Sequence, residues 1–189
     1  MKYIENLLKG QKVEWKTLGE VCELQRGKSI TSKDLKDGNI PVIAGGQKPA
    51  YFHNQHNRKD ETIVVAGSGA YAGFVTYWNE PIFVSDAFSI KPNNEDLFCK
   101  YVFHFLKDKQ DYLYGMKKGG GVPHVYAKDV ARILIPIPPL KVQQEIANIL
   151  DKFTTLEAEL EAELEARKKQ YEYYRDSLLS FNKMGGASL

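Results

Sequence analysis

Two patterns of hydrophobic and polar residues meet at Pro139. Up to that residue, short apolar runs rich in β-branched and aromatic side chains alternate with glycine, proline and asparagine. From Leu140 to Met184 the chain contains neither proline nor glycine, and apolar residues recur at steps of three and four. The first pattern is typical of short strands joined by turns, whereas the second predicts one long helix.

Apolar runs bounded by turn residues predict the strands of the first part. These runs lie at 39–44, 61–66, 73–78, 82–85, 87–90 and 132–137. Between Glu95 and Met116 the apolar spacing becomes helical, which predicts one or two helices. The sequence therefore predicts an α+β fold: a globular domain over 1–139 with a twisted mixed sheet, one long C-terminal coiled-coil helix over 140–182, and a flexible tail over 183–189.

The long helix carries an apolar stripe on a charged surface. At 1.5 Å per residue the segment spans roughly 60 Å. A helix of this kind needs a partner for its stripe, and because the sequence shows no second long helix we expect pairing between molecules. The residues expected in this dimerisation seam are Ile146, Ile149, Phe153, Leu156, Leu160, Leu164, Tyr171 and Leu178.

The order of charges along this helix favours antiparallel pairing. Three near-copies of Leu-Glu-Ala-Glu begin at Leu156, and a basic cluster follows at 167–169. With a dyad near Ala162, the basic cluster faces the region of Glu157 on the partner, whereas parallel pairing would place the acidic run against itself. Two consecutive steps of four, from Leu156 to Leu164, form a stutter that locally unwinds a supercoil.

Composition narrows the class of protein. The 189 residues carry a formal net charge of +2. Residues 1–140 hold 19 Lys and Arg against 15 Asp and Glu, and residues 141–189 hold 7 against 9, so the basic excess lies on the globular part. No run approaches the ~20 apolar residues of a membrane span. The two cysteines, Cys22 and Cys99, are too few for a disulfide framework. We expect a soluble cytoplasmic protein without a signal peptide.

Four loops share a composition suited to nucleic acid. The loops at 45–51, 54–59, 67–73 and 117–124 combine basic, amide, hydroxyl or aromatic side chains, and all but the second contain glycine. Basic side chains bind phosphates, and arginine, lysine and amides can bind base edges. For any single loop an ordinary turn is the alternative. The candidates for DNA contact are Lys48, Tyr51, Arg58, Lys59, Ser68, Tyr71, Lys117, Lys118 and His124.

Several segments resemble catalytic motifs, but each lacks at least one required feature. Gly67-x-Gly69-x-x-x-Gly73 is one residue too long for a dinucleotide fingerprint, and Gly27-Lys28-Ser29 lacks the earlier glycine of a phosphate loop. Ser68 lacks the first glycine of a nucleophile elbow. Asn79-Glu80-Pro81-Ile82 departs at two positions from the Asn-Pro-Pro-aromatic signature of amino-methyltransferases, and His53 and His56 lack further metal ligands. We expect no catalysis, metal or cofactor in this chain.

Several segments together resemble the specificity (S) subunits of type I restriction–modification enzymes. The resemblance spans nearly the whole chain, and its most specific part is the run from Gly121 to Leu150. The segments that carry it are Trp15 to Val21, Arg26-Gly27-Lys28-Ser29-Ile30, Ile40 to Ile43 with Gly45-Gly46, Gly67 to Gly73, Gly121 to Val125, Ile135 to Leu140, Gln144 to Leu150, and Tyr171 to Phe181.

The resemblance implies a function and a set of partners. Members of this family usually carry two target-recognition domains, each followed by a long helix, and each domain reads half of a bipartite site on double-stranded DNA. One domain and one helix resemble half of such a subunit, which implies pairing with itself or with another half. Modification subunits would supply S-adenosylmethionine and methylation, and restriction subunits would supply ATP-driven cleavage. The helix alone fits equally well a coiled-coil adaptor between proteins, without DNA specificity.

Overall fold

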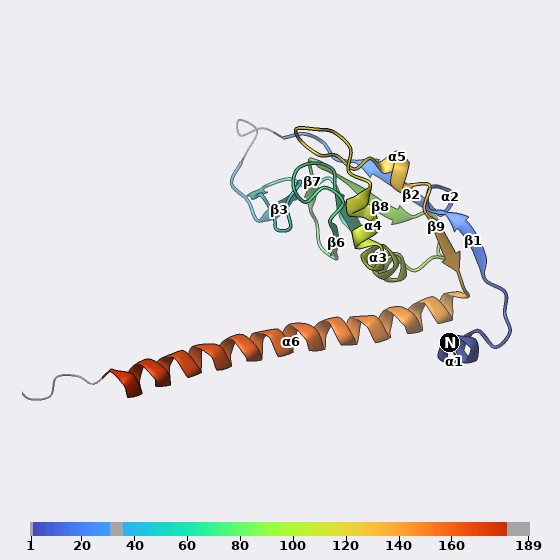
Figure 1. Ribbon diagram of the computed structural model, residues 1–189. Coiled ribbons are helices and arrows are strands. Elements are labelled where there is room, and N and C mark those ends of the chain that lie inside the picture. Colours follow the sequence, from blue (N-terminus) through green and yellow to red (C-terminus); the bar gives the residue numbers. More distant parts are fainter. Residues whose placement is uncertain (1, 31–35, 181–189) are drawn as a thin grey trace, which may run out of the picture. The chain divides into compact units, whose positions relative to one another are not determined.

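The computed structural model describes residues 2–30 and 36–180 (Figure 1). The chain divides into two compact units, Met1–Ala147 and Asn148–Leu189. The first holds every strand and all of the hydrophobic core, and the second is the remainder of the C-terminal helix.

A four-stranded antiparallel sheet forms the centre of the first unit. Its strand order is β2 (Cys22–Arg26), β8 (Ala87–Pro92), β5 (Thr62–Ala66) and β6 (Val75–Trp78). Every residue of β5 is buried, as a continuous apolar run between two neighbouring strands requires. Strands β5 and β8 contribute four residues to the main hydrophobic core: Ile63, Val65, Phe88 and Ile90.

Two smaller sheets complete the β structure. Strand β3 (Ile40–Ile43) pairs antiparallel with β4 (Tyr51–His53) and parallel with β7 (Phe83–Val84), and β1 (Glu14–Thr17) pairs antiparallel with β9 (Leu134–Ile137). The predicted α+β class and the long helix are confirmed. The β structure is divided among three sheets rather than forming one, because loops and turns interrupt the strands after only two to six residues.

Short helices pack against the strands of the unit. The predicted helical segment contains α3 (Cys99–Asp108) and α4 (Gln110–Gly115), and α3 buries Tyr101, Val102 and Leu106 in the core. Three other helices were not among the predicted elements: α1 (Lys2–Leu8), α2 (Leu18–Val21) and α5 (Ala127–Val130). Helix α3 packs against β5 and β6, and α2 and α5 pack against β2. The backbone N–H and the hydroxyl of Thr17 both donate to the Glu20 carboxylate at 2.6 Å, which fixes the start of α2 and lowers the pKa of Glu20.

The long helix α6 (Leu140–Leu179) begins inside the first unit. Val142, Gln143 and Ala147 are buried there. The Gln143 side chain accepts from the Phe98 N–H at 2.9 Å and donates to the carbonyls of Asp96 and Pro138, each at 2.8 Å. The predicted boundary at 139 thus marks the start of the helix, while its first turns belong to the compact domain.

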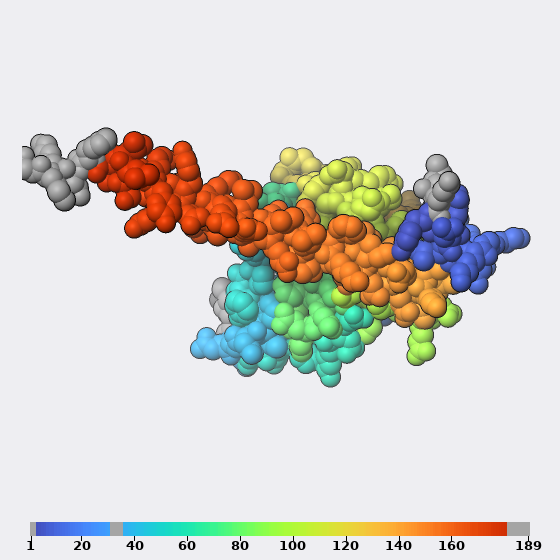
Figure 2. All heavy atoms as spheres, turned by 90° about the horizontal axis from the view of Figure 1, so that it is seen from below, coloured from blue at the N-terminus to red at the C-terminus, as the bar shows by residue number. Residues whose placement is uncertain are grey.

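The second unit is a rod one helix wide, drawn in orange to red in Figure 2. All of its described residues beyond Asp151 are exposed. The last helical residue is Leu179, and the predicted tail at 183–189 lies outside the described residues. In the part of the chain that the structure describes, no helix is long and apolar enough to cross a membrane.

Candidate nucleic-acid interface

Three of the four candidate loops converge on Ser68. The segment around Ser68 pairs with His124, and the Gly69 N–H donates to the Pro123 carbonyl at 3.0 Å. The loop that begins at Gly45 also lies against Ser68, because a Cβ atom added to Gly45 would lie 2.5 Å from the Ser68 carbonyl oxygen. The loops at 45–51, 67–73 and 117–124 therefore form one surface, although up to 79 residues separate them in sequence.

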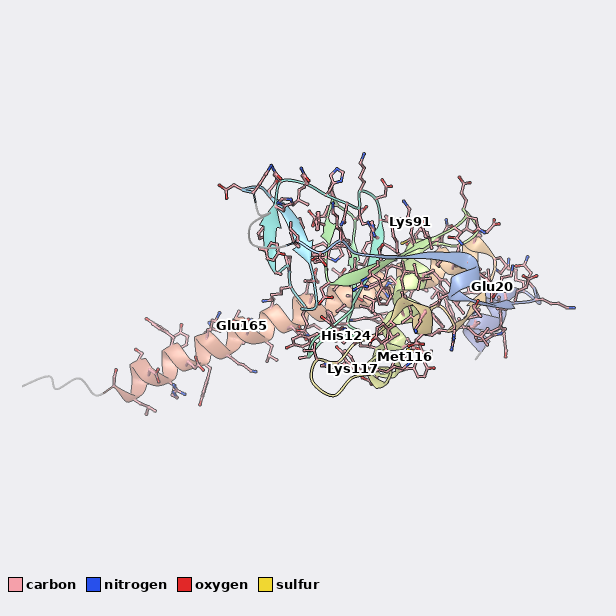
Figure 3. All side chains as sticks on the ribbon, turned by 90° about the horizontal axis from the view of Figure 1, so that it is seen from above. Glu20, Lys91, Met116, Lys117, His124 and Glu165 are labelled. Carbon is pink, nitrogen blue, oxygen red and sulfur yellow. The ribbon has the colours of Figure 1, made fainter. Side chains whose placement is uncertain are left out.

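Basic and aromatic side chains lie on this converged surface. Lys117 donates to the Ala70 carbonyl at 2.8 Å, and its ammonium group lies 4.5 Å from the ring centroid of Tyr114. Tyr71 is 44% exposed. The ring of His124 stacks on that of Tyr126, with the two ring centroids 6.0 Å apart. Figure 3 shows Lys117 and His124 close together, in agreement with the backbone pairing of Lys118 with His124. These groups combine a cation, a flat aromatic surface and hydrogen-bonding capacity, as DNA contact requires.

Lys118 has a different environment from Lys117. Its backbone exchanges two hydrogen bonds with His124, at 2.9 and 2.8 Å. Its ammonium group forms an ion pair with Asp129 at 2.6 Å, which lowers the pKa of that carboxyl group. Lys118 therefore shapes the loop and neutralises Asp129, whereas the charge of Lys117 has no carboxylate partner within residues 2–30 and 36–180.

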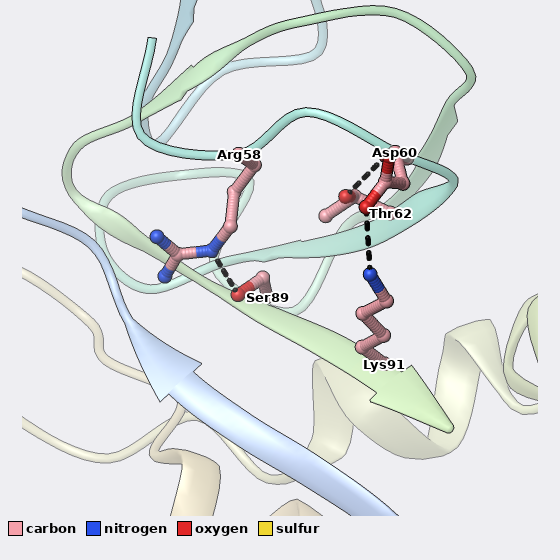
Figure 4. Close-up of polar contacts among 5 residues, drawn as sticks. All are labelled: Arg58, Asp60, Thr62, Ser89 and Lys91. Carbon is pink, nitrogen blue, oxygen red and sulfur yellow. Dashed lines mark hydrogen bonds and ion pairs between the residues drawn. The ribbon is translucent and has the colours of Figure 1, made fainter. Parts of the chain in front are cut away.

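The Arg58 side chain forms hydrogen bonds within its own domain. Its Nε donates to Ser89 Oγ at 2.7 Å (Figure 4). Nη1 donates to the Asn57 carbonyl at 2.7 Å, and Nη2 donates to the carbonyls of Gln25 and Arg26, each at 3.3 Å. Burial lowers the pKa of the guanidinium group. The adjacent candidate, Lys59, is exposed.

The two remaining candidates, Lys48 and Tyr51, belong to the β3–β4 hairpin. Lys48 is exposed in the connecting loop, and the half-buried Tyr51 hydroxyl lies 3.5 Å from the Ile30 carbonyl. Of the nine sequence candidates, the structure thus brings five together around Ser68: Ser68 itself, Tyr71, Lys117, Lys118 and His124. Lys48 and Tyr51 belong to the third loop, at 45–51, whose contact with Ser68 is made by Gly45, and Arg58 and Lys59 lie on the segment before β5.

Three further residues near these loops, Arg26, Lys28 and Asp86, were not among the candidates predicted from the sequence. Gly27 packs against the β7–β8 connection, where its N–H donates to the Ala87 carbonyl at 2.8 Å and the Lys28 N–H donates to the Val84 carbonyl at 3.0 Å. Arg26 and Asp86 line a pocket of about 120 Å³ together with His124 and Tyr126. The Arg-Gly-Lys run was a usable signal, because two exposed cations flank a glycine.

The residues of the incomplete catalytic motifs have structural partners. The Ser68 hydroxyl donates to Asp86. Nδ1 of the buried His53 accepts the Lys36 N–H at 3.3 Å, and its ring meets that of Phe83 edge-on. Within the described ranges, no three His, Cys, Asp or Glu side chains are grouped to hold a metal ion. Burial raises the pKa of Cys22 and of Cys99 to about 12, so neither thiol is activated.

The seam residues of α6 fall into two groups. Ile146 packs partly against the core of the first unit, and Ile149 is half-buried. The other six are well exposed, from 49% at Leu156 to 74% at Leu178. The members of this exposed stripe are Phe153, Leu156, Leu160, Leu164, Tyr171 and Leu178.

Comparison with known families identifies the family of this chain. Residues 11–166 match the type I restriction modification DNA specificity domain. The chain belongs to this family. A specificity subunit is a non-catalytic component and has no cofactor of its own. The EcoR124I/EcoR124II specificity subunit of Escherichia coli is 34% identical over 199 residues, which cover 96% of this chain and 48% of that subunit.

Solved structures share the fold of this family member. The S subunit of M. genitalium aligns with a TM-score of 0.70 at 21% identity, over 92% of this chain and 48% of that one. A chain from a study of type I R-M complex assembly and conformational transition aligns with a TM-score of 0.67 at 22% identity, over 90% and 50%. The chain spans about half the length of these relatives.

Proposed function

We propose that this chain is the DNA-recognition component of a type I restriction–modification complex and reads one half of a bipartite site. The observation that carries the proposal is the convergence of three glycine-containing loops on Ser68, with Lys117, Tyr71 and His124 around it. The family match supports the same conclusion, because its description is that of a DNA specificity domain. Arg26 and Lys28 extend the positive charge of the surface.

The proposed assembly contains two copies joined by antiparallel α6 helices. The apolar residues of α6 support this because they form pairs that are equidistant from Ala162 in sequence: Leu160 with Leu164, Phe153 with Tyr171, Leu150 with Tyr174, and Ile146 with Leu178. A two-fold axis at Ala162 would therefore bring apolar residues against one another and Arg167 against Glu157. Identical halves predict a target with inverted-repeat symmetry.

Catalysis would come from the partners of this assembly. Modification subunits would bind S-adenosylmethionine and methylate adenine N6 after turning the base out of the duplex. Restriction subunits would add ATP-dependent cleavage. The chain would act in the cytoplasm, where it would recognise the DNA sequence and bind the modification subunits.

A methylation map of a host genome tests the proposal. We expect a bipartite N6-methyladenine motif when this gene is present beside its modification-subunit gene, and loss of that motif when this gene alone is deleted. Two inverted identical halves would support the homodimer, and two different halves would indicate pairing with another recognition half. A map that does not change would contradict the proposed role in DNA recognition.

Binding to duplex DNA separates this role from that of a protein–protein adaptor. If the loops contact phosphates, the logarithm of the binding constant falls steeply and linearly with the logarithm of the salt concentration. An adaptor would retain its coiled-coil partner and show no such dependence on salt. We expect Lys117→Ala to reduce the slope by about one phosphate contact.

A further inference from the structure

Asp86 occupies a rigid position beside the converged loops. It lies in the two-residue connection between β7 and β8, where its neighbours Ser85 and Ala87 are buried. Its carbonyl oxygen accepts the Gly67 N–H at 3.1 Å, and the Ser85 N–H donates to the Ile43 carbonyl at 2.8 Å. The backbone is therefore fixed on both sides, while Asp86 itself is exposed.

One oxygen of the Asp86 carboxylate is held by Ser68. The Ser68 hydroxyl donates to Oδ2 of Asp86, and Ser68 is only 8% exposed. Oδ1 has no partner within residues 2–30 and 36–180. Since an ionised carboxylate only accepts hydrogen bonds, the serine orients Asp86 and leaves Oδ1 to accept from a donor outside the protein.

The charge of Asp86 is not neutralised, unlike that of the neighbouring Asp129. Asp129 forms its ion pair with Lys118 at 2.6 Å and is largely covered. Asp86 has no ion-pair partner in the described part of the chain, although it lines a pocket with Arg26 and His124. An unpaired carboxylate on a surface that binds phosphates weakens that binding, unless it meets a hydrogen-bond donor of the DNA.

A DNA duplex offers such donors only on its bases. Phosphates and deoxyriboses within a duplex present acceptors. The amino groups of cytosine and adenine lie in the major groove, whereas that of guanine lies in the minor groove, which is only about 6 Å wide and admits a protein loop less readily. Adenine also presents its N7 acceptor beside its amino group, which a carboxylate repels, so cytosine matches Asp86 better. Arg26 lines the same pocket and is suited to the O6 and N7 atoms of guanine.

We propose that Asp86, oriented by Ser68, is a specificity-determining residue that accepts a hydrogen bond from the N4 amino group of a cytosine in the target. This inference rests on the proposed function and assigns one base position to one side chain. Thymine and guanine would present oxygen acceptors at that point and would be rejected. Asp86 thus selects sequence at the expense of general affinity for DNA.

Selection from a random-sequence duplex library tests the assignment with the full-length chain. We compare wild type with Asp86→Asn, Asp86→Ala and Asp129→Asn, and sequence the bound duplexes. Asp86→Ala should reduce the preference for cytosine at one position by roughly tenfold to a hundredfold. Asp86→Asn should shift that position towards adenine, because an amide both donates and accepts. Asp129→Asn, which removes a carboxylate already paired with Lys118, should leave the preference for cytosine at that position unchanged.

The possible outcomes separate this inference from the proposed function. If the Asp86 variants select the wild-type motif, or lose affinity for all sequences in equal proportion, the assignment to Asp86 is wrong and the role in DNA recognition stands. If wild type selects no motif, both fail. Thermal unfolding of each variant identifies loss of fold, and the near-isosteric Asp86→Asn keeps an acceptor for Ser68 in any case.

Discussion

Gly27 lies so close to the carbonyl oxygen of Ser85 that a Cβ atom on Gly27 would come within 2.0 Å of it. The contact is between two backbones, so no side chain can move to relieve it. We expect Gly27→Ala to lower the free energy of unfolding by about 1–3 kcal/mol or more. It should also displace Arg26 and Lys28 and weaken DNA binding. Urea denaturation and a binding titration measure the two effects.

Gly120→Ala is the matched control for that substitution. A Cβ at Gly120 meets nothing within 4 Å. We expect its free energy of unfolding to change by less than about 1 kcal/mol. Equal effects of the two substitutions would show that the close approach of Gly27 to Ser85 is not what constrains this segment.

Gln143 joins α6 to the globular domain. Its fully buried side chain satisfies the Phe98 N–H and the carbonyls of Asp96 and Pro138. Gln143→Leu leaves these three backbone groups without their partner, so we expect a loss of at least about 2 kcal/mol in the free energy of unfolding. The exposed neighbour Gln144 provides the control. Gln144→Leu should change the free energy of unfolding by less than about 0.5 kcal/mol. Similar losses in both variants would contradict this role.

Arg58 and Lys59 are adjacent but should differ in effect. Arg58→Ala removes hydrogen bonds of a charged, partly buried group, and we expect a loss of about 2 kcal/mol in the free energy of unfolding. Lys59→Ala should leave stability unchanged. If Lys59 contacts a phosphate, its loss reduces the salt dependence of DNA binding by about one contact. Full stability in Arg58→Ala with weakened DNA binding would instead make Arg58 a DNA contact.

The exposed stripe of α6 predicts the oligomeric state. Leu160→Asp places a charge at the centre of the proposed seam, and we expect the dimer to dissociate in sedimentation equilibrium. Ala158→Asp makes the same change on the opposite side of the helix and should remain dimeric. A Leu160→Asp variant with the mass of the wild type would show that this stripe does not join the subunits.

A cysteine pair in the same helix reports the direction of pairing. In the double variant Leu156→Cys and Lys168→Cys, antiparallel helices centred on Ala162 should give a disulfide between subunits. The native thiols of Cys22 and Cys99 are buried, with their pKa raised to about 12, and should not compete. If the helices are parallel, each single variant, Leu156→Cys or Lys168→Cys, should form a disulfide between the same position of two subunits, and the disulfide between positions 156 and 168 should not form.

The Leu-Glu-Ala-Glu repeats are expected to set the spacing between half-sites. Removing residues 160–163 shortens the helix by about 6 Å and rotates its C-terminal part by about 40°. We therefore expect the non-specific spacer of the methylated motif to change while both half-site sequences stay the same. An unchanged spacer in the methylation map would show that helix length does not set this distance.

Features that depend on local pattern could be predicted from the amino-acid sequence. The period of apolar residues defined α6, because 3.6-residue spacing without proline or glycine favours only a helix. The apolar run at 61–66 likewise predicted the buried strand β5. Strand β2 and helix α2 were missed, since Cys22 to Arg26 lacks a clean alternation and α2 depends on the Thr17–Glu20 contact.

Which candidates share a surface depends on contacts between distant parts of the chain. The loops of Ser68 and His124 are 56 residues apart, and their meeting depends on hydrogen bonds between backbones, which side-chain identity does not reveal. The same is true of Arg58, whose hydrogen bonds to β2 and β8 join segments that are distant in the sequence. Asp86 was not predicted because acidic residues are not expected on a surface proposed to bind DNA. Its position beside Ser68 arises from the packing of β7 and β8 against β3 and β5, a long-range arrangement that no local spacing records.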